Sequence, residues 1–361
     1  MGLTDGPFAA LLGILGLVAF AACVVLLPRV AGRGPRQVAA RAGLVVGTQS
    51  IVVFAVLVAV NSSFGFFGSW ADLLGTDKSR VRVVGGAAVA APPAVAQPSL
   101  RPTSDALSRA LSPKDGRLDA VVFHGLRSGV TATGYVYLPP QYTRRAYRHR
   151  RLPVVLVLTA DVRGTLTRLR LPAVAAGQIA GGAVQPTVYV LMSPVGACVD
   201  VPGGQQANTF FAEDVPMAVA TSYRVAQDGP GWGVIGDASG GYCAAKLALR
   251  DGDRFTAAAS AASSYGAPPG DLYGDRYGRS TAIQHENDLL WTLGHRPPPP
   301  AHLLVLTAGG TGEAARRLTA LVRPPTSADS LTVHGGGALP TWQRDLPAVL
   351  RWLSGRLSPE N

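Results

Sequence analysis

A run of small residues at 231–250, GWGVIGDASGGYCAAKLALR, carries the spacing that a catalytic nucleophile requires. An apolar strand leads into a tight turn and then into a helix, which is the context of a nucleophile elbow. The central residue of such an elbow adopts a strained conformation, so the positions two before and two after it must be small. Gly236 and Gly240 meet this requirement around position 238, and Gly241 follows them. The spacing therefore predicts the turn of an acyl-transfer enzyme, but the residue at the nucleophile position is an alanine, Ala238.

Ser239 is the nearest hydroxyl that could replace the missing nucleophile. Centred on 239, the position two before is Asp237, whose side chain would crowd the turn, and the shifted hydroxyl would point away from the oxyanion donors. A small polar residue that opens a helix is the simpler interpretation of Ser239. His334, at the expected end of the last strand, is a candidate base, and Glu313 or Asp237 a candidate acid. A displaced catalytic arrangement therefore stays open as an alternative.

The other residue types indicate no metal, nucleotide or nucleic-acid chemistry. The remaining histidines form no pair with the spacing that zinc needs: His124, His149, His285, His295 and His302. The glycine-rich turns lack the GxxxxGK[ST] pattern. The formal charge of +11 comes almost wholly from arginine, and the stretches 144–151 and 163–170 lack the interleaved aromatic residues of a stacking platform. We interpret them as solvated faces, and expect no metal, no cofactor and no nucleic-acid partner.

The elements that must position these residues begin near Gly116. Short β-branched apolar runs alternate with helical segments, which is the pattern of a mostly parallel sheet covered on both faces. The expected strands are 120–123, 134–138, 152–158, 187–192, 232–236, 255–260, 303–308 and 330–334, and the expected helices are 163–176, 208–225, 241–250 and 346–357. The sequence predicts an α/β fold of three layers with seven or eight strands.

Two apolar segments precede this domain. Residues 8–27 contain no charge over a length that matches the hydrocarbon core of a bilayer, and residues 42–60 form a second apolar segment. We expect residues 1–70 to be a membrane anchor with two transmembrane helices. Residues 71–115, rich in alanine and proline, are expected to be a linker, and 116–361 the folded domain.

Arginines set the expected orientation of this anchor. Arg29, Arg33, Arg36 and Arg41 lie between the two segments, whereas residues 1–7 and 61–77 have no basic residue. The positive-inside rule then places the short loop in the cytoplasm, and the N-terminus and the large domain outside. The leader MGLTDGP lacks the basic residues of a signal peptide. An oxidising compartment would permit a disulfide between Cys198 and Cys243.

Several longer stretches carry a resemblance to a known family. They are the two apolar segments, FGFFGSWADLLG after them, YVYLPPQY at 135–142, LPVVLVL at 152–158, CVDVPGG at 198–204, GGYCAAKLAL in the elbow helix and LPAVLRWLS at 346–354. With these, the chain resembles actinobacterial members of the esterase family that includes esterase D, S-formylglutathione hydrolase and the mycolyltransferases. The resemblance implies an α/β-hydrolase fold, an elbow of the form G-x-S-x-G-G, and a catalytic histidine in a GGH stretch just before TW.

Carried over to this chain, the nucleophile falls on Ala238 and the histidine on Gly337, within GGGALPTW at 335–342. Alanine has no oxygen to attack a carbonyl, and glycine has no base to take its proton. In TAGGTGE at 307–313, where the family acid is expected, only Glu313 is ionisable.

We therefore expect a catalytically degenerate esterase-family protein that binds or scaffolds at the cell envelope. Its expected partners are the lipid bilayer, through the two helices, and an envelope lipid, glycolipid or small ester as ligand. An active carboxylesterase or acyltransferase that uses Ser239 is the alternative. A structural component that acts through its membrane segments alone is the third possibility.

Overall fold

A computed structural model describes residues 22–23, 25–27, 29, 34–64, 99–103, 105–227, 229–262, 264–269, 276–307, 312–334 and 338–358. The chain divides into two compact units, residues 1–91 and 92–361. The first unit contains the helix α2 (Pro35–Phe64), and the second contains the sheet with its covering helices.

The predicted membrane segments fall in the first unit. Segment 42–60 lies within α2, whereas most of segment 8–27 lies outside the described residues. Over the part of the chain that is described, no helix has both the length and the apolar character required to cross a bilayer. Membrane anchoring therefore stays a prediction.

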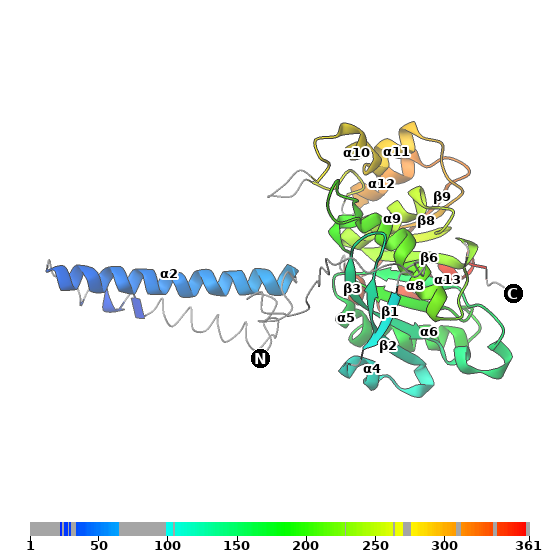
Figure 1. Cartoon of the computed structure of the whole chain (residues 1–361), viewed down its shortest axis with the longest axis horizontal. Coiled ribbons are helices and arrows are strands. Elements are labelled where there is room, and N and C mark those ends of the chain that lie inside the picture. The colour runs from blue at the N-terminus through cyan, green and yellow to red at the C-terminus, as the bar shows by residue number, and fades with distance from the viewer. Residues whose placement is uncertain are drawn as a thin grey trace, which may run out of the picture. The chain divides into compact units, whose positions relative to one another are not determined.

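The second unit is built on a nine-stranded sheet with the order β1-β2-β3-β5-β4-β6-β7-β8-β9 (Figure 1). Strands β1 to β3 are antiparallel to their neighbours, whereas β4 to β9 run parallel to one another. The bounds are β1 Ser99–Thr103, β2 Arg117–His124, β3 Thr131–Leu138, β4 Val154–Leu158, β5 Val188–Met192, β6 Trp232–Asp237, β7 Ala257–Ala261, β8 His302–Thr307 and β9 Ser327–Thr332. All eight predicted strands are present, and β1 is an additional one.

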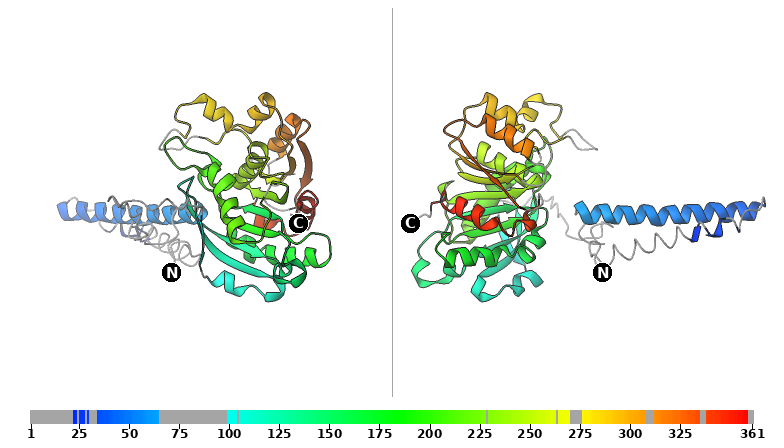
Figure 2. Two further views of the ribbon diagram at one scale, coloured as in Figure 1. Left: turned by 45° about the vertical axis from the view of Figure 1, so that its right-hand side comes forward. Right: turned by 180° about the vertical axis from the view of Figure 1, so that it is seen from behind.

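Helices cover both faces of this sheet, which gives the predicted three layers (Figure 2). The bounds are α4 Ala106–Ala110, α5 Val162–Thr167, α6 Leu171–Ala180, α7 Ala207–Thr209, α8 Val215–Ser222, α9 Ala238–Arg250, α10 Thr281–Glu286, α11 Leu289–His295, α12 Gly312–Leu321 and α13 Leu346–Ser354. Short turns of 3₁₀-helix are η2 Pro113–Asp115, η3 Pro140–Thr143, η4 Arg145–Tyr147, η5 Gly196–Cys198, η7 Gly229–Gly231 and η8 Leu339–Thr341, and η6 Phe210–Asp214 is π-helical.

Each face of the sheet has its own apolar core. One core joins the sheet to α8, α9, α11 and α12, and the other joins it to α6 and α13. The central strands β4 (VVLVL) and β5 (VYVLM) are buried at every residue. Continuous apolar runs of this kind are typical of parallel strands that are covered on both sides.

The prediction of a single helix over 163–176 was wrong. The chain forms α5 and α6 instead, and Arg170 between them has the left-handed backbone angle φ = 53°. Pro172 lies in the first turn of α6, where its missing N–H is tolerated, whereas inside a continuous helix it would remove a hydrogen bond. The predicted helix 208–225 is likewise divided, into α7, η6 and α8.

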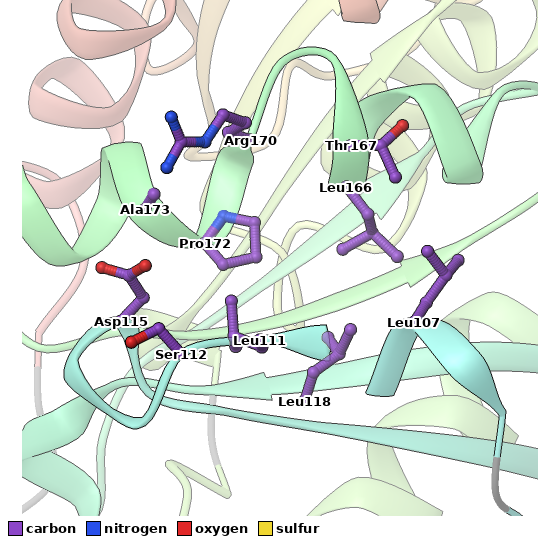
Figure 3. A pocket seen from close by; sticks show the side chains of 10 residues that line it. All are labelled: Leu107, Leu111, Ser112, Asp115, Leu118, Leu166, Thr167, Arg170, Pro172 and Ala173. Atoms are coloured by element: carbon purple, nitrogen blue, oxygen red, sulfur yellow. The ribbon is translucent and has the colours of Figure 1, made fainter. Parts of the chain in front are cut away.

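The predicted linker 71–115 was too long, because residues from 99 onward belong to the sheet unit. Strand β1 pairs with β2, although its sequence SLRPT has no alternating apolar pattern and its side chains are mostly exposed. An edge strand can carry a proline such as Pro102, and needs little apolar surface. Leu107 and Leu111 face Leu166 of α5 across a cavity of about 360 Å³ (Figure 3).

Lys246, in the middle of α9, is a basic side chain with no exposed surface. Its Nζ donates hydrogen bonds to the carbonyl oxygen of Cys198 and to Oδ1 of Asn287, the latter at 2.6 Å. Burial lowers the pKa of Lys246 from 10.5 to about 7, because an ammonium group loses its hydration, and Arg250 acts in the same direction.

This buried amine predicts a pH-dependent stability. Between about pH 7 and pH 10.5 the unfolded chain holds a proton on Lys246 that the folded chain does not. The free energy of unfolding should therefore rise with pH across this window, by up to about 1.4 kcal/mol per unit, and level off below pH 7. Urea unfolding followed by tryptophan fluorescence at pH 7.5, 8.5 and 9.5, without reductant, measures this slope.

Two variants complete this experiment. Lys246→Met should lose the slope, whereas Lys114→Met, which removes an exposed lysine, should keep it. A wild-type free energy of unfolding that stays constant from pH 7.5 to 9.5 would contradict the buried, neutral state of Lys246.

Candidate active site

The turn between β6 and α9 has the geometry of a nucleophile elbow. Strand β6 ends at Asp237 and α9 begins at Ala238, whose φ is +49°. A non-glycine residue rarely adopts this left-handed conformation, because its Cβ crowds the backbone. Ala238 is exposed at the apex, so the position from which a nucleophile would project carries a methyl group.

Three glycines permit this turn. A Cβ on Gly236 would overlap the Gly240 carbonyl oxygen, and a Cβ on Gly240 would overlap that of Leu158 at the end of β4. A Cβ on Gly241 would overlap the carbonyl oxygen of Ala261 at the end of β7. All three glycines are needed for the start of α9 to lie directly against the strands.

Asp237 is buried beneath the elbow and links three segments. Its Oδ2 accepts hydrogen bonds from the Thr159 hydroxyl after β4, at 3.2 Å, and from the N–H of Leu339 in η8, at 2.5 Å. Burial raises the pKa of the Asp237 carboxyl, while these two hydrogen bonds act in the opposite direction. Its other oxygen, Oδ1, is buried without a hydrogen-bond partner among the described residues. With both oxygens enclosed beneath the turn, Asp237 is placed to support the elbow.

Ser239 is exposed in the first turn of α9. Its hydroxyl makes no hydrogen bond to any described residue. Its N–H lies among the helical N–H groups that lack an intrahelical partner, and it occupies the position from which one oxyanion donor comes in a hydrolase elbow. The second donor of such sites comes from the loop after the strand that corresponds to β4, here Thr159 to Asp161. Backbone donors of an oxyanion hole therefore have counterparts in this chain.

His334 lies two residues after β9 and forms a hydrogen-bonded pair with Asp345. The distance from Nδ1 of His334 to Oδ1 of Asp345 is 3.0 Å, and the backbone N–H of His334 donates to Oδ2 at 2.6 Å. Burial acts to raise the pKa of Asp345, but the two hydrogen bonds from His334 leave it below its usual value. A carboxylate that orients an imidazole is the arrangement found in catalytic triads. The His334 side chain is 63% exposed, with no hydroxyl of the described residues bonded to its ring.

Asp345 was not found by sequence reasoning, because an aspartate just before Leu346 and Pro347 indicates a helix N-cap. In the structure its side chain caps nothing and turns to His334 instead. Glu313, the other candidate acid, lies in the first turn of α12 and pairs with Arg316 and Arg317. Hydrogen bonds from these two arginines lower its pKa. Glu313 is thus paired within its own helix, and Gly337 lies outside the described residues.

A disulfide fixes the loop after β5 to the elbow helix. The structure joins Cys198 of η5 to Cys243 of α9, with the two Cα atoms 5.5 Å apart. Three successive residues of η5 have left-handed angles, with φ of 53° at Gly196, 51° at Ala197 and 55° at Cys198. The hydrogen bond from Lys246 to the Cys198 carbonyl oxygen gives this turn a second tie to α9.

Among the described residues, no group of three histidine, cysteine or acidic side chains could hold a metal ion. The expected absence of a cofactor and of a nucleic-acid partner stays a prediction.

The strand order, the crossover helices and the elbow together define an α/β-hydrolase fold. A ferulic acid esterase superposes with a TM-score of 0.54 at 17% identity, over 67% of this chain and 98% of its own. An S-formylglutathione hydrolase from Agrobacterium tumefaciens gives 0.55 at 14% identity, over 72% and 100%. The fluorophosphonate-binding serine hydrolase FphF of Staphylococcus aureus gives 0.52 at 15% identity, over 66% and 98%. At these identities the likeness concerns the fold alone.

Sequence comparison assigns the family. Residues 128–322 match the family described as "Putative esterase", which is more than half of the 361 residues. The chain belongs to this esterase family. No curated protein matches it in sequence. The actinobacterial, membrane-anchored subgroup stays a prediction.

The close contact of Gly240 with β4 predicts that a single added methyl group destabilises the fold. Gly240→Ala should lower the free energy of unfolding by about 3 kcal/mol, because the backbone of a central strand must move to admit the side chain. Chemical denaturation of the two proteins under the same conditions measures the difference.

Gly177→Ala is the matched control, since this glycine lies inside α6 and an added Cβ would meet nothing within 4 Å. This variant should raise the free energy of unfolding by up to about 1 kcal/mol. Equal effects of the two substitutions would show that α9 does not pack against β4 as described.

Proposed function

We propose that this protein binds an ester or acyl ligand at its elbow without cleaving it, and that it acts by binding or scaffolding at the cell envelope. In this proposal the chain has lost the serine and the histidine of the esterase family. The ligand class is an envelope lipid, a glycolipid or a small ester.

The methyl group of Ala238 is the observation that carries the proposal. It lies at the apex of an elbow that has the required glycines and the left-handed backbone, at the start of a helix whose first N–H groups have no intrahelical partner. Acyl transfer through a covalent intermediate needs an oxygen or sulfur at that point. A site of this kind retains the features that bind a carbonyl group and lacks the atom that attacks it.

A fluorophosphonate probe tests this proposal directly. The wild-type protein should not be labelled and should not hydrolyse p-nitrophenyl butyrate above background. Ala238→Ser should introduce labelling, because the hydroxyl would project from an elbow that is already formed. Adding Gly337→His to Ala238→Ser should raise the hydrolysis rate by about 10²-fold, at the lower end of what a general base contributes.

Ser239→Ala serves as the control in the wild-type protein and in Ala238→Ser. It should change neither the labelling nor the hydrolysis of either protein. Labelling of the wild-type protein that disappears in Ser239→Ala would overturn the proposal.

The His334–Asp345 pair favours one alternative, an active carboxylesterase or acyltransferase with Ser239 as a displaced nucleophile. Asp345 supplies His334 with a carboxylate that the sequence did not reveal, in place of the expected Glu313 or Asp237. In this alternative, Ser239→Ala and His334→Ala would each abolish a hydrolysis that the wild-type protein performs. The exposed position of His334, and a Ser239 hydroxyl that bonds to none of the described residues, give this alternative less support than the binding function has.

The second part of the proposal concerns location. The uncharged run 8–27, the apolar run 42–60 and the four arginines between them support two transmembrane helices with the esterase-like unit outside the cytoplasm. An extracytoplasmic location also suits a disulfide between Cys198 and Cys243.

Protease treatment of intact cells examines this topology. The protein should remain in the membrane pellet after a carbonate wash, and external protease should digest residues 116–361 without lysis. A cytoplasmic protein of known location serves as the intactness control. Protection of the large unit until the cells are lysed would refute the outward orientation, and recovery in the soluble fraction would refute the anchor.

A further inference from the structure

A loop rich in arginine, residues 144–151, connects β3 to β4 and contains η4. Arg144, Arg145, Arg148, His149 and Arg150 in this loop are all exposed. Seven arginines elsewhere in the described chain pair with carboxylates: Arg117, Arg127, Arg168, Arg296, Arg316, Arg317 and Arg356. Within the same described residues, no carboxylate pairs with Arg144, Arg145, Arg148 or Arg150. The positive charge of this loop is therefore concentrated and not neutralised.

The loop is fixed to the body of the unit by its neighbours. The Tyr142 hydroxyl accepts a hydrogen bond of 2.8 Å from the N–H of Arg224, and the Arg224 guanidinium lies 4.4 Å from the centre of the Tyr142 ring. At the other end, Arg151 donates to the carbonyl oxygen of Val225. Because both ends of the loop are held, its arginines cannot move apart as they would in a free segment. Repulsion between their like charges then costs free energy unless an anion binds.

A cavity of about 580 Å³ opens beside the loop, within the size range of small-molecule sites. None of the described residues that line it is acidic: Gln141, Arg144, Tyr147, Ile179, Ala180, Gly182, Val184, Gln185 and Pro186. Gln141 is only 7% exposed, and its Oε1 has no hydrogen-bond partner in the described structure. The cavity thus combines a cation, an aromatic ring and a buried amide with unused capacity.

The arginines are not needed to cap the C-terminal end of α6, which lies beside the cavity. The carbonyl oxygens of Gly177, Gln178 and Ile179 already accept backbone hydrogen bonds from residues 181–184. A cation is therefore not required to satisfy them.

This cavity is separate from the elbow. The arginine-rich loop precedes β4 and Pro186 precedes β5, so the cavity lies at the amino ends of these parallel strands. The elbow follows the carboxyl end of β6, at the opposite edge of the sheet.

We propose that this cavity binds a phosphorylated polyol, which is a phosphate group carried on a sugar or inositol ring. The guanidinium of Arg144, with Arg145 and Arg148 near it in the loop, holds the phosphate through charge-assisted, bidentate hydrogen bonds. The Gln141 amide hydrogen-bonds ring hydroxyls, and the Tyr147 ring packs against the face of the polyol. The same headgroup can arrive free in solution or attached to a lipid.

Isothermal titration of the full chain in nanodiscs of neutral lipid, with myo-inositol 1-phosphate as the probe, tests the proposal. Arg144→Gln should weaken binding at least about tenfold. Arg163→Gln removes the same charge from α5, outside the cavity, and should change affinity less than about twofold. Gln141→Leu should weaken inositol phosphate while leaving inorganic phosphate unchanged.

The outcomes separate specific binding from general attraction. No binding of inositol phosphate, or an equal loss in Arg144→Gln and Arg163→Gln, overturns the site. Equal affinity for inorganic phosphate and inositol phosphate overturns recognition of the polyol. Nanodiscs that contain phosphatidylinositol distinguish the source: a lipid headgroup should block the soluble probe, whereas an unchanged titration assigns the site to a free phosphorylated polyol.

Discussion

The contact between the first turn of α9 and the ends of β4 and β7 is the constraint on which the site depends. Backbone meets backbone there, so Gly236, Gly240 and Gly241 admit no side chain. That contact forces the sharp turn at the end of β6. This turn raises Ala238 to the surface and buries Asp237 beneath it. The first N–H groups of α9 lack helical partners, as at the start of any α-helix. These features follow from close packing alone and do not require a nucleophile.

Helix α9 is also the element to which neighbouring segments are attached. Cys243 holds the loop after β5 covalently, and Lys246 holds the same loop through the Cys198 carbonyl oxygen. Tyr242 and Lys246 both bond to Asn287, which lies between α10 and α11. Asn287 thereby ties the segment between β7 and β8 to the helix that begins at the elbow. The surroundings of the elbow are thus organised by successive turns of one helix.

The sequence predicted the parts of this structure that rest on local patterns. Apolar runs revealed the parallel strands, because burial on both faces requires such runs, and glycine spacing revealed the elbow. Strand β1 was not predicted, because an exposed edge strand needs no alternation of apolar and polar residues. Asp345 was missed because the same residue type caps helices, and only the folded chain places it beside His334. The left-handed turn at Ala197 and Cys198 gave no signal, since neither residue type favours that conformation.

The backbone at Ala238 has an implication for how this position could change. Every non-glycine residue there bears the cost of a positive φ, about 1 to 2 kcal/mol, and glycine would relieve it. If stability alone shaped the turn, glycine would be the favoured occupant. An alanine instead keeps an exposed Cβ at the apex, so a single oxygen atom added to that carbon would place a hydroxyl there without any further adjustment of the main chain.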